Sequence, residues 1–162
     1  MMTRYKLNEQ SKASGSGFTL LELLAAMVIL LLLTSVALPV ARVQVQHTRE
    51  VELHRALRQM REAIDRYKDF TDRGMIPVTP DSFGYPPDLQ TLVDGVPLKG
   101  SATAKYKFLR RIPIDPMTGK ADWGMRSMQD DPDSQSWGGS NVFDIHSQSR
   151  GIALDGTKYG DW

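Results

Sequence analysis

The residue types of a hydrolytic active site lie closest together near the C-terminal end of this sequence, where His146 is flanked by Asp144, Ser147 and Ser149. A histidine, a carboxylate and a hydroxyl can serve as base, orienting group and nucleophile. Neighbouring residues of a strand point to opposite faces, so we expect His146 to point away from Ser147. None of the motifs G-x-S-x-G, H-E-x-x-H and G-x-x-x-x-G-K-[ST] is present. The sequence therefore predicts no enzymatic activity.

The overall composition excludes further kinds of chemistry. The 162 residues contain no cysteine, which excludes a disulfide, a thiolate zinc site and a cysteine nucleophile. The 20 Lys and Arg residues nearly balance the 19 Asp and Glu residues, and the formal net charge is +1. Binding to nucleic acid needs a clear surplus of positive charge, so we expect no nucleic-acid partner.

One carboxylate, Glu22, is unusual because of its surroundings. Residues 18–41 hold no other formal charge. As a helix, residues 18–38 would be roughly 30 Å long, which is the thickness of the hydrocarbon core of a bilayer. A charged residue inside a membrane-spanning helix is costly and marks a functional site that needs a partner. Three basic residues and one acidic residue precede the segment, which places the N-terminus in the cytoplasm.

The apolar segment continues without a break into an amphipathic one at residues 39–73. Apolar residues recur there with a 4-3-4-3 spacing that forms one helical stripe, and charged residues cover the other faces. We expect one helix of about 55 residues, in which Pro39 removes a backbone hydrogen bond and kinks the helix or loosens one turn. His47 and His54 are expected to be exposed polar positions. The stripe consists of Leu53, Leu57, Met60, Ile64 and Tyr67, and the charged faces include Glu50 and Arg61.

The remaining residues, 74–162, hold most of the prolines and glycines. Residues 142–145 and 151–154 are candidate strands between turn residues, and residues 88–93 predict a short helix that runs into a turn. The apolar stripe of the long helix needs a cover, which this part must supply. The sequence therefore predicts an α+β fold, with a long N-terminal helix packed by a small C-terminal antiparallel β-sheet and loops.

The N-terminal segment has three interpretations. A secretory signal peptide needs small residues just beyond the apolar run, and residues 36–39 are a poor cleavage site. A plain membrane anchor fits the geometry but does not explain Glu22. The third interpretation rests on the run Gly17-Phe18-Thr19-Leu20-Leu21-Glu22, which together with the apolar segment resembles the prepilin cleavage motif of type IV pilins and pseudopilins. Pro39 also lies where these proteins often carry a proline that kinks the helix.

This resemblance implies that a prepilin peptidase removes residues 1–17 by cutting between Gly17 and Phe18, and N-methylates Phe18. Glu22 would then meet a terminal amine during filament assembly, either on a neighbouring subunit or on its own chain. A buried carboxylate needs such a counter-charge. The resemblance further implies a single-pass protein of the bacterial inner membrane that assembles into a homo-oligomeric helical filament, with a periplasmic C-terminal domain of type IV pilin-like fold.

Parts of residues 74–162 resemble the major pseudopilins of type II secretion. This implies a subunit of a periplasmic pseudopilus that drives protein export together with minor pseudopilins and an inner-membrane assembly platform. The lack of cysteine favours this over a type IV pilin, since many pilins close a C-terminal loop with a disulfide. A type IV pilin of a surface fibre for adhesion, motility or DNA uptake, and an anchored periplasmic binding module, stay open as alternatives. The matching residues are Tyr106 to Gly119, Val142 to Ser147, Leu154 to Thr157 and Trp162.

Major pseudopilins typically bind Ca²⁺ in the C-terminal loop, so the resemblance makes Asp144, Asp155 and Asp161 candidate metal ligands. Arg150 stands where the family has an aspartate, and an arginine cannot ligate a cation. The alternative is that these three carboxylates are turn residues, because aspartate suits turns for its own hydrogen bonding. The acidic cluster at residues 130–133 lacks the spacing of an EF-hand loop and is expected to be a solvated loop.

Overall fold

The computed structural model describes residues 17–100 and 105–162, apart from the side chains of residues 36–39. The predicted leader, residues 1–17, lies outside the described residues except for Gly17. The chain divides into two compact units, the first ending at Ala41 and the second running from Arg42 to Trp162. The second unit, residues 42–162, is called the head below.

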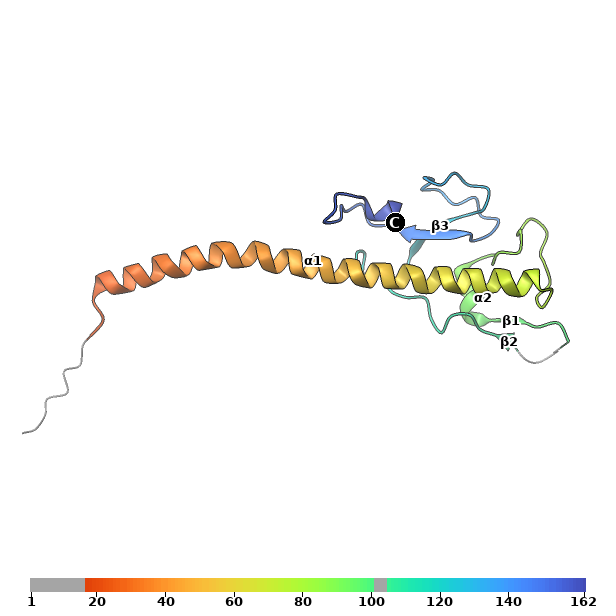
Figure 1. Cartoon of the computed structure of the whole chain (residues 1–162), viewed down its shortest axis with the longest axis horizontal. Helices are drawn as coiled ribbons and strands as arrows, with labels where there is room; N and C mark the ends of the chain where they lie inside the picture. Colours follow the sequence, from red (N-terminus) through yellow and green to blue (C-terminus); the bar gives the residue numbers. More distant parts are fainter. Residues whose placement is uncertain (1–16, 101–104) are drawn as a thin grey trace, which may run out of the picture. The chain divides into compact units, whose positions relative to one another are not determined.

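Helix α1, Leu20–Asp72, is the longest element, with 53 residues (Figure 1). It confirms the prediction of one long helix, and it begins two residues later than expected. The cause is Thr19, whose hydroxyl oxygen accepts a hydrogen bond of 3.2 Å from the amide of Glu22 and so caps the first turn. Helical backbone continues through Pro39, and the kink or loosened turn at that residue stays a prediction.

The C-terminal end of α1 is closed by a turn around Gly74. Gly74 has a φ of 69°, which favours glycine. Its amide donates to the carbonyl of Thr71, and the amide of Met75 donates to the carbonyl of Phe70, each at 2.9 Å. This pair of bonds is a Schellman motif, which satisfies carbonyl groups that the last helical turn leaves unpaired. The chain therefore leaves the helix where the sequence changes to a Pro- and Gly-rich composition.

In the first unit, the helix presents apolar side chains that are exposed. All large apolar residues from 18 to 33 are more than half exposed. By length and composition, α1 is the one helix among the described residues that could cross a membrane. The hydroxyls of Thr34 and Ser35 donate to the carbonyls of Leu30 and Leu32, each at 2.7 Å. These hydroxyl groups are thus satisfied within the helix, which lipid surroundings require.

In the head, a short helix and a pair of strands follow α1. Helix α2, Leu89–Asp94, begins at Asp88, whose carboxylate accepts from the amide of Thr91 at 2.6 Å, and ends at Gly95. This confirms the predicted short helix and its turn. Strands β1 (Val96–Pro97) and β2 (Lys105–Tyr106) form an antiparallel pair.

Strands β3 (Trp123–Arg126) and β4 (Asp144–Ser147) form a second antiparallel pair. Gly124 lies opposite His146 in the register. The predicted strand at 142–145 therefore exists but is shifted by two residues. The predicted strand at 151–154 is wrong. Only an isolated bridge between Ile152 and Lys158 forms there, because Ala153 donates to the carbonyl of Thr157 and the chain turns back at once.

The apolar stripe of α1 forms the centre of the core of the head. Leu53, Met60 and Ile64 are fully buried, as predicted. Figure 1 shows β3 on one side of α1 and α2, β1 and β2 on the other. The cover is thus two small antiparallel sheets among the described residues instead of one, and the predicted pilin-like α+β class is confirmed. The residues that pack on the stripe are Ile76, Leu89, Leu92, Phe108, Leu109, Trp123, Val142, Ile145, Ala153 and Tyr159.

Candidate functional site

The peptide bond predicted to be cut joins Gly17 to Phe18, just ahead of α1. Residues 17–19 are not helical and are exposed, and the side chain of Phe18 is 76 % exposed. No described atom lies within 4 Å of the position that a Cβ atom on Gly17 would take. Exposed chain outside regular structure is where proteases cut most readily. The local geometry is therefore suited to cleavage at this bond.

Glu22 lies in the first turn of α1 and is exposed. Thr19 and Glu22 have the spacing of a capping box, and the N-terminus of a helix favours negative charge. Among the described residues, no side chain pairs with the carboxylate of Glu22. Phe18 is four residues earlier, in the short non-helical stretch just ahead of α1.

Asp144, the first candidate metal ligand, is held by two arginines. The Nε atom of Arg61 lies 2.7 Å from its Oδ1 atom, and an Nη atom of the same residue lies 3.2 Å from its Oδ2 atom. The guanidinium of Arg126 approaches Oδ2 at 3.6 Å. The negative charge of Asp144 is thus already neutralised by side chains of the head.

Asp155 and Asp161 form no ion pair with Arg61 or Arg126, although Asp161 lines the same pocket as Arg126. The carboxylate of Asp155 accepts from the hydroxyl of Thr157 at 2.7 Å and from its amide at 2.9 Å, and these bonds lower the pKa of Asp155. This is the turn role that the sequence left as the alternative. Asp161 is exposed in a short 3-10 helix, η1, Tyr159–Asp161.

The three carboxylates do not fit a calcium site. No group of three or more His, Asp or Glu side chains converges among the described residues. Asp144 faces two guanidinium groups, which repel a cation, and Arg150 is exposed at the position where the resemblance implies an aspartate. In the acidic cluster, Asp130 accepts from the amides of Ser127 and Gly138, which lower its pKa and give it a role in shaping the loop.

Glu50 is a polar anchor of the head that sequence reasoning missed. It was expected on a charged face of the helix, but it is only 8 % exposed. Its carboxylate accepts from the hydroxyl of Tyr159 at 2.8 Å, the amide of Leu154 at 2.9 Å and the amide nitrogen of Gln46 at 3.1 Å. Burial and the bond to Glu50 raise the pKa of Tyr159. Two of these partners lie more than 100 residues away in sequence, so no local pattern could reveal the site.

Two histidines, His47 and His54, were predicted to be exposed polar positions on the long helix, and the structure agrees. His47 and His54 are exposed on α1. The ring of His54 stacks on that of Trp162, with the ring centroids 4.1 Å apart. The C-terminal tryptophan is thus attached to the helix through an exposed residue.

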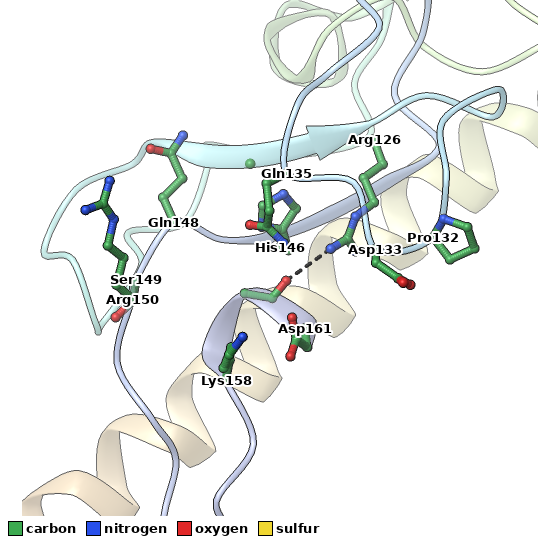
Figure 2. Close-up of a pocket in the computed structure, with 12 residues that line it drawn as sticks. Arg126, Pro132, Asp133, Gln135, His146, Gln148, Ser149, Arg150, Lys158 and Asp161 are labelled. Carbon is green, nitrogen blue, oxygen red and sulfur yellow. Dashed lines mark hydrogen bonds between the residues drawn. The ribbon is translucent and has the colours of Figure 1, made fainter.

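His146 lines an open pocket between β3, β4 and the C-terminal segment (Figure 2). It is 2 % exposed, and burial lowers its pKa, so the ring is neutral at neutral pH. Its Nδ1 atom lies 3.0 Å from the carbonyl of Ser147, and among the described residues its Nε2 atom has no hydrogen-bond partner. The hydroxyl of Ser147 donates to Asp115 at 2.7 Å. The histidine, serine and aspartate of the sequence cluster therefore do not form a catalytic triad.

The residues that carry the resemblance to pseudopilins in this region have packing roles. Asp115 is fully buried and accepts from the amide of Met117 as well as from Ser147. The indole nitrogen of Trp123 donates to the carbonyl of Pro113 at 2.9 Å. These bonds fasten the segment that precedes β3 onto the second sheet.

Comparison with known families gives one match. Residues 13–38 match the family model of the prokaryotic N-terminal methylation motif. Neither the curated proteins nor the solved structures contain a significant match to the chain. The matched range includes Gly17, Phe18 and Glu22 and the apolar part of α1. Pilin-like proteins with this motif are a structural, non-enzymatic family. With an apolar N-terminal helix and small antiparallel sheets packed on that helix, the chain has a pilin-like α+β fold that begins with a prokaryotic N-terminal methylation motif.

Proposed function

We propose that the chain is a subunit of a periplasmic pseudopilus that drives protein export by type II secretion. One observation carries the proposal: the methylation motif leads directly into a helix whose apolar half is exposed and whose other half organises a folded head. Exposed apolar surface of this extent must be covered by lipid or by other subunits. The subunit is stored in the inner membrane and transferred to a filament, where the helices of its neighbours replace lipid.

Processing prepares the subunit for this transfer. The peptidase cuts the exposed bond between Gly17 and Phe18 and methylates the new amine. That amine provides the positive charge that Glu22 lacks, on the same chain or on a neighbouring subunit. In the low-dielectric interior of a helical bundle, such a pair is strongly favoured over an isolated carboxylate. The pair thus fixes the register of an incoming helix more than it strengthens its binding.

Two features support a pseudopilus over a surface fibre. The C-terminal half carries the pseudopilin-like segments at 106–119 and 142–147, and the first of these is fastened by the buried Asp115. The chain also has no cysteine with which to close a pilin-type loop. If the chain instead builds a surface fibre, fibres longer than the periplasm will be visible at native expression. Deletion of the gene would then leave the amount of exported protein unchanged.

Intact-mass spectrometry of the protein from membranes tests the processing step. We expect a mass that corresponds to residues 18–162 plus one methyl group. The variant Gly17→Val is expected to keep the leader, because a branched side chain blocks the position before the cut. Gly15→Val is the matched control and should be processed normally. An unmodified chain that retains residues 1–17 would instead favour an anchored binding module without a filament.

A further inference from the structure

The C-terminal segment, residues 148–162, has little apolar core of its own. Ala153 and Tyr159 are buried, whereas Ile152 and Leu154 are 62 % and 44 % exposed. Regular structure in this segment consists of one isolated bridge and the short helix η1. A segment with so few apolar contacts and so little regular structure opens easily. It needs polar attachments, or a bound ion, to stay closed.

Arg61 supplies the first attachment, from the charged face of α1. Besides its two bonds to Asp144, its guanidinium donates to the carbonyl of Ile145 at 3.2 Å and to the main-chain oxygen of Trp162 at 2.8 Å. One side chain therefore joins the helix, strand β4 and the last residue of the segment. The planar fork of arginine allows this, because its donors point in fixed directions toward several acceptors.

Arg126, at the end of β3, supplies the second attachment. Its side chain is 9 % exposed. Its Nε atom donates to the carbonyl of Ser134 at 2.9 Å, and an Nη atom donates to the carbonyl of Gly160 at 3.1 Å (Figure 2). The remaining Nη atom faces Asp144. Arg126 thus joins the 132–135 loop and η1 to the same carboxylate that Arg61 holds.

The acceptors of these two arginines are the kind of ligands that calcium takes. They are one aspartate carboxylate, Asp144, and main-chain oxygens from Ile145, Trp162, Ser134 and Gly160. Calcium binds such carboxylates and carbonyls and can order a loop with little core. We propose that the guanidinium groups of Arg61 and Arg126 take the place of a divalent cation and hold the C-terminal segment closed without metal. The pair is called the arginine clamp below.

The charges around the clamp favour this arrangement over an added cation. Two guanidinium groups share the carboxylate of Asp144 and neutralise it without an added cation, whereas Asp133 and Asp161, which line the same pocket as Arg126, form no ion pair with either arginine. Arg150 and Lys158 add two exposed positive charges within the same segment. The guanidinium groups of Arg61 and Arg126 occupy the oxygen acceptors that a divalent cation would need, and they would repel it. The inference rests on contacts within the head and holds whether the chain builds a pseudopilus or a surface fibre.

Thermal unfolding of the full-length processed protein in detergent micelles tests the clamp, with near-ultraviolet circular dichroism as the readout. The unfolding temperature of the unchanged protein should be the same in excess EGTA and in millimolar calcium chloride. Arg126→Met should lower that temperature by about 5 °C or more, because it leaves the carbonyls of Ser134 and the buried Gly160 without a donor and removes the second guanidinium beside Asp144. Arg58→Met, an exposed position on α1, the helix that carries Arg61, is the control and should cause no shift.

If Arg126→Met does not fold, the milder variant Arg61→Lys tests the same proposal by hydrogen exchange. Arg61→Lys keeps the charge but loses the fork, so hydrogen exchange should become faster in residues 148–162 and stay unchanged in α2. Stabilisation of the unchanged protein by calcium, or its destabilisation by EGTA, would overturn the proposal. So would an Arg61→Lys variant with unaltered exchange in the C-terminal segment.

Discussion

Two glutamates on the same helix, Glu22 and Glu50, occupy opposite situations. Glu22 lies in the exposed apolar half, and no described side chain pairs with its carboxylate. Glu50 is buried in the head, where Tyr159, Leu154 and Gln46 donate to its carboxylate. The chain thus satisfies one carboxylate by its own folding. In the proposed function, the other is satisfied by the processed N-terminus or by another subunit.

The comparison extends to the apolar residues of the two halves. The leucines of α1 from Leu20 to Leu33 are exposed, whereas Leu53 and Leu57 in the second half of the helix are buried in the core of the head. The same residue type therefore stabilises a membrane or filament state in the first unit and the folded head in the second. Substitutions in the first half should accordingly affect filament formation and secretion, and substitutions in the second half should affect the stability of the head.

The largest contrast is expected between Leu57→Ala and Leu24→Ala. Leu57 is 1 % exposed in the core, so its truncation should reduce the free energy of unfolding of the head by about 2–5 kcal/mol. Leu24 is 52 % exposed, and its truncation should leave the stability of the head unchanged. Urea unfolding of the processed protein in micelles measures both. Equal losses in the two variants would contradict the division into two independent halves.

A smaller contrast is expected between the two glutamates. Glu50→Ala leaves the hydroxyl of Tyr159 and the amide of Leu154 without an acceptor, which should cost about 1–3 kcal/mol of stability. Glu22→Ala should leave unfolding of the head unchanged but abolish filaments and secretion in cells. Glu52→Ala, an exposed neighbour, is the control for both measurements. Normal filaments from Glu22→Ala would refute the role given to this carboxylate.

The smallest effect is a pH dependence due to His146. Burial lowers its pKa in the folded head below the ordinary value of about 6.5. Below that pH the unfolded chain takes up a proton that the folded head does not, so the free energy of unfolding falls as the solution is acidified. His146→Gln should flatten this dependence between neutral and mildly acidic pH, as measured by urea midpoints. If the free energy of unfolding of the variant depends on pH as steeply as before, titratable groups other than His146 cause the dependence.

Periodicity predicted the parts of the fold that local physics controls. The apolar run and the 4-3-4-3 stripe gave α1 and its buried face, and Asp88 with Gly95 gave the capped helix α2. The cleavage motif was read from six adjacent residues. Each of these patterns involves residues that are close together in sequence, and the same residues form the helix, cap or motif that the pattern predicts.

The errors have a common cause, which is pairing over long distances in sequence. The strand expected at 151–154 is a turn, because hydrogen bonds within the segment replace a ladder. The metal role of Asp144 stays a prediction, and the sequence did not reveal that Arg61 from α1 and Arg126 from β3 pair with its carboxylate. Glu50 was expected on an exposed, charged face of the helix, because its hydrogen-bond donors Leu154 and Tyr159 lie more than 100 residues away in sequence.

The sequence by itself determined the membrane-sized apolar helix, the processing motif, the amphipathic continuation and the absence of a disulfide. These depend on composition and spacing along one chain. Only the tertiary structure decided which charges are buried and how they are paired: Glu50 with Tyr159, and Asp144 with the arginine clamp. The reason is physical, since the energy of a charge depends on the groups that folding brings around it and on the water that folding removes.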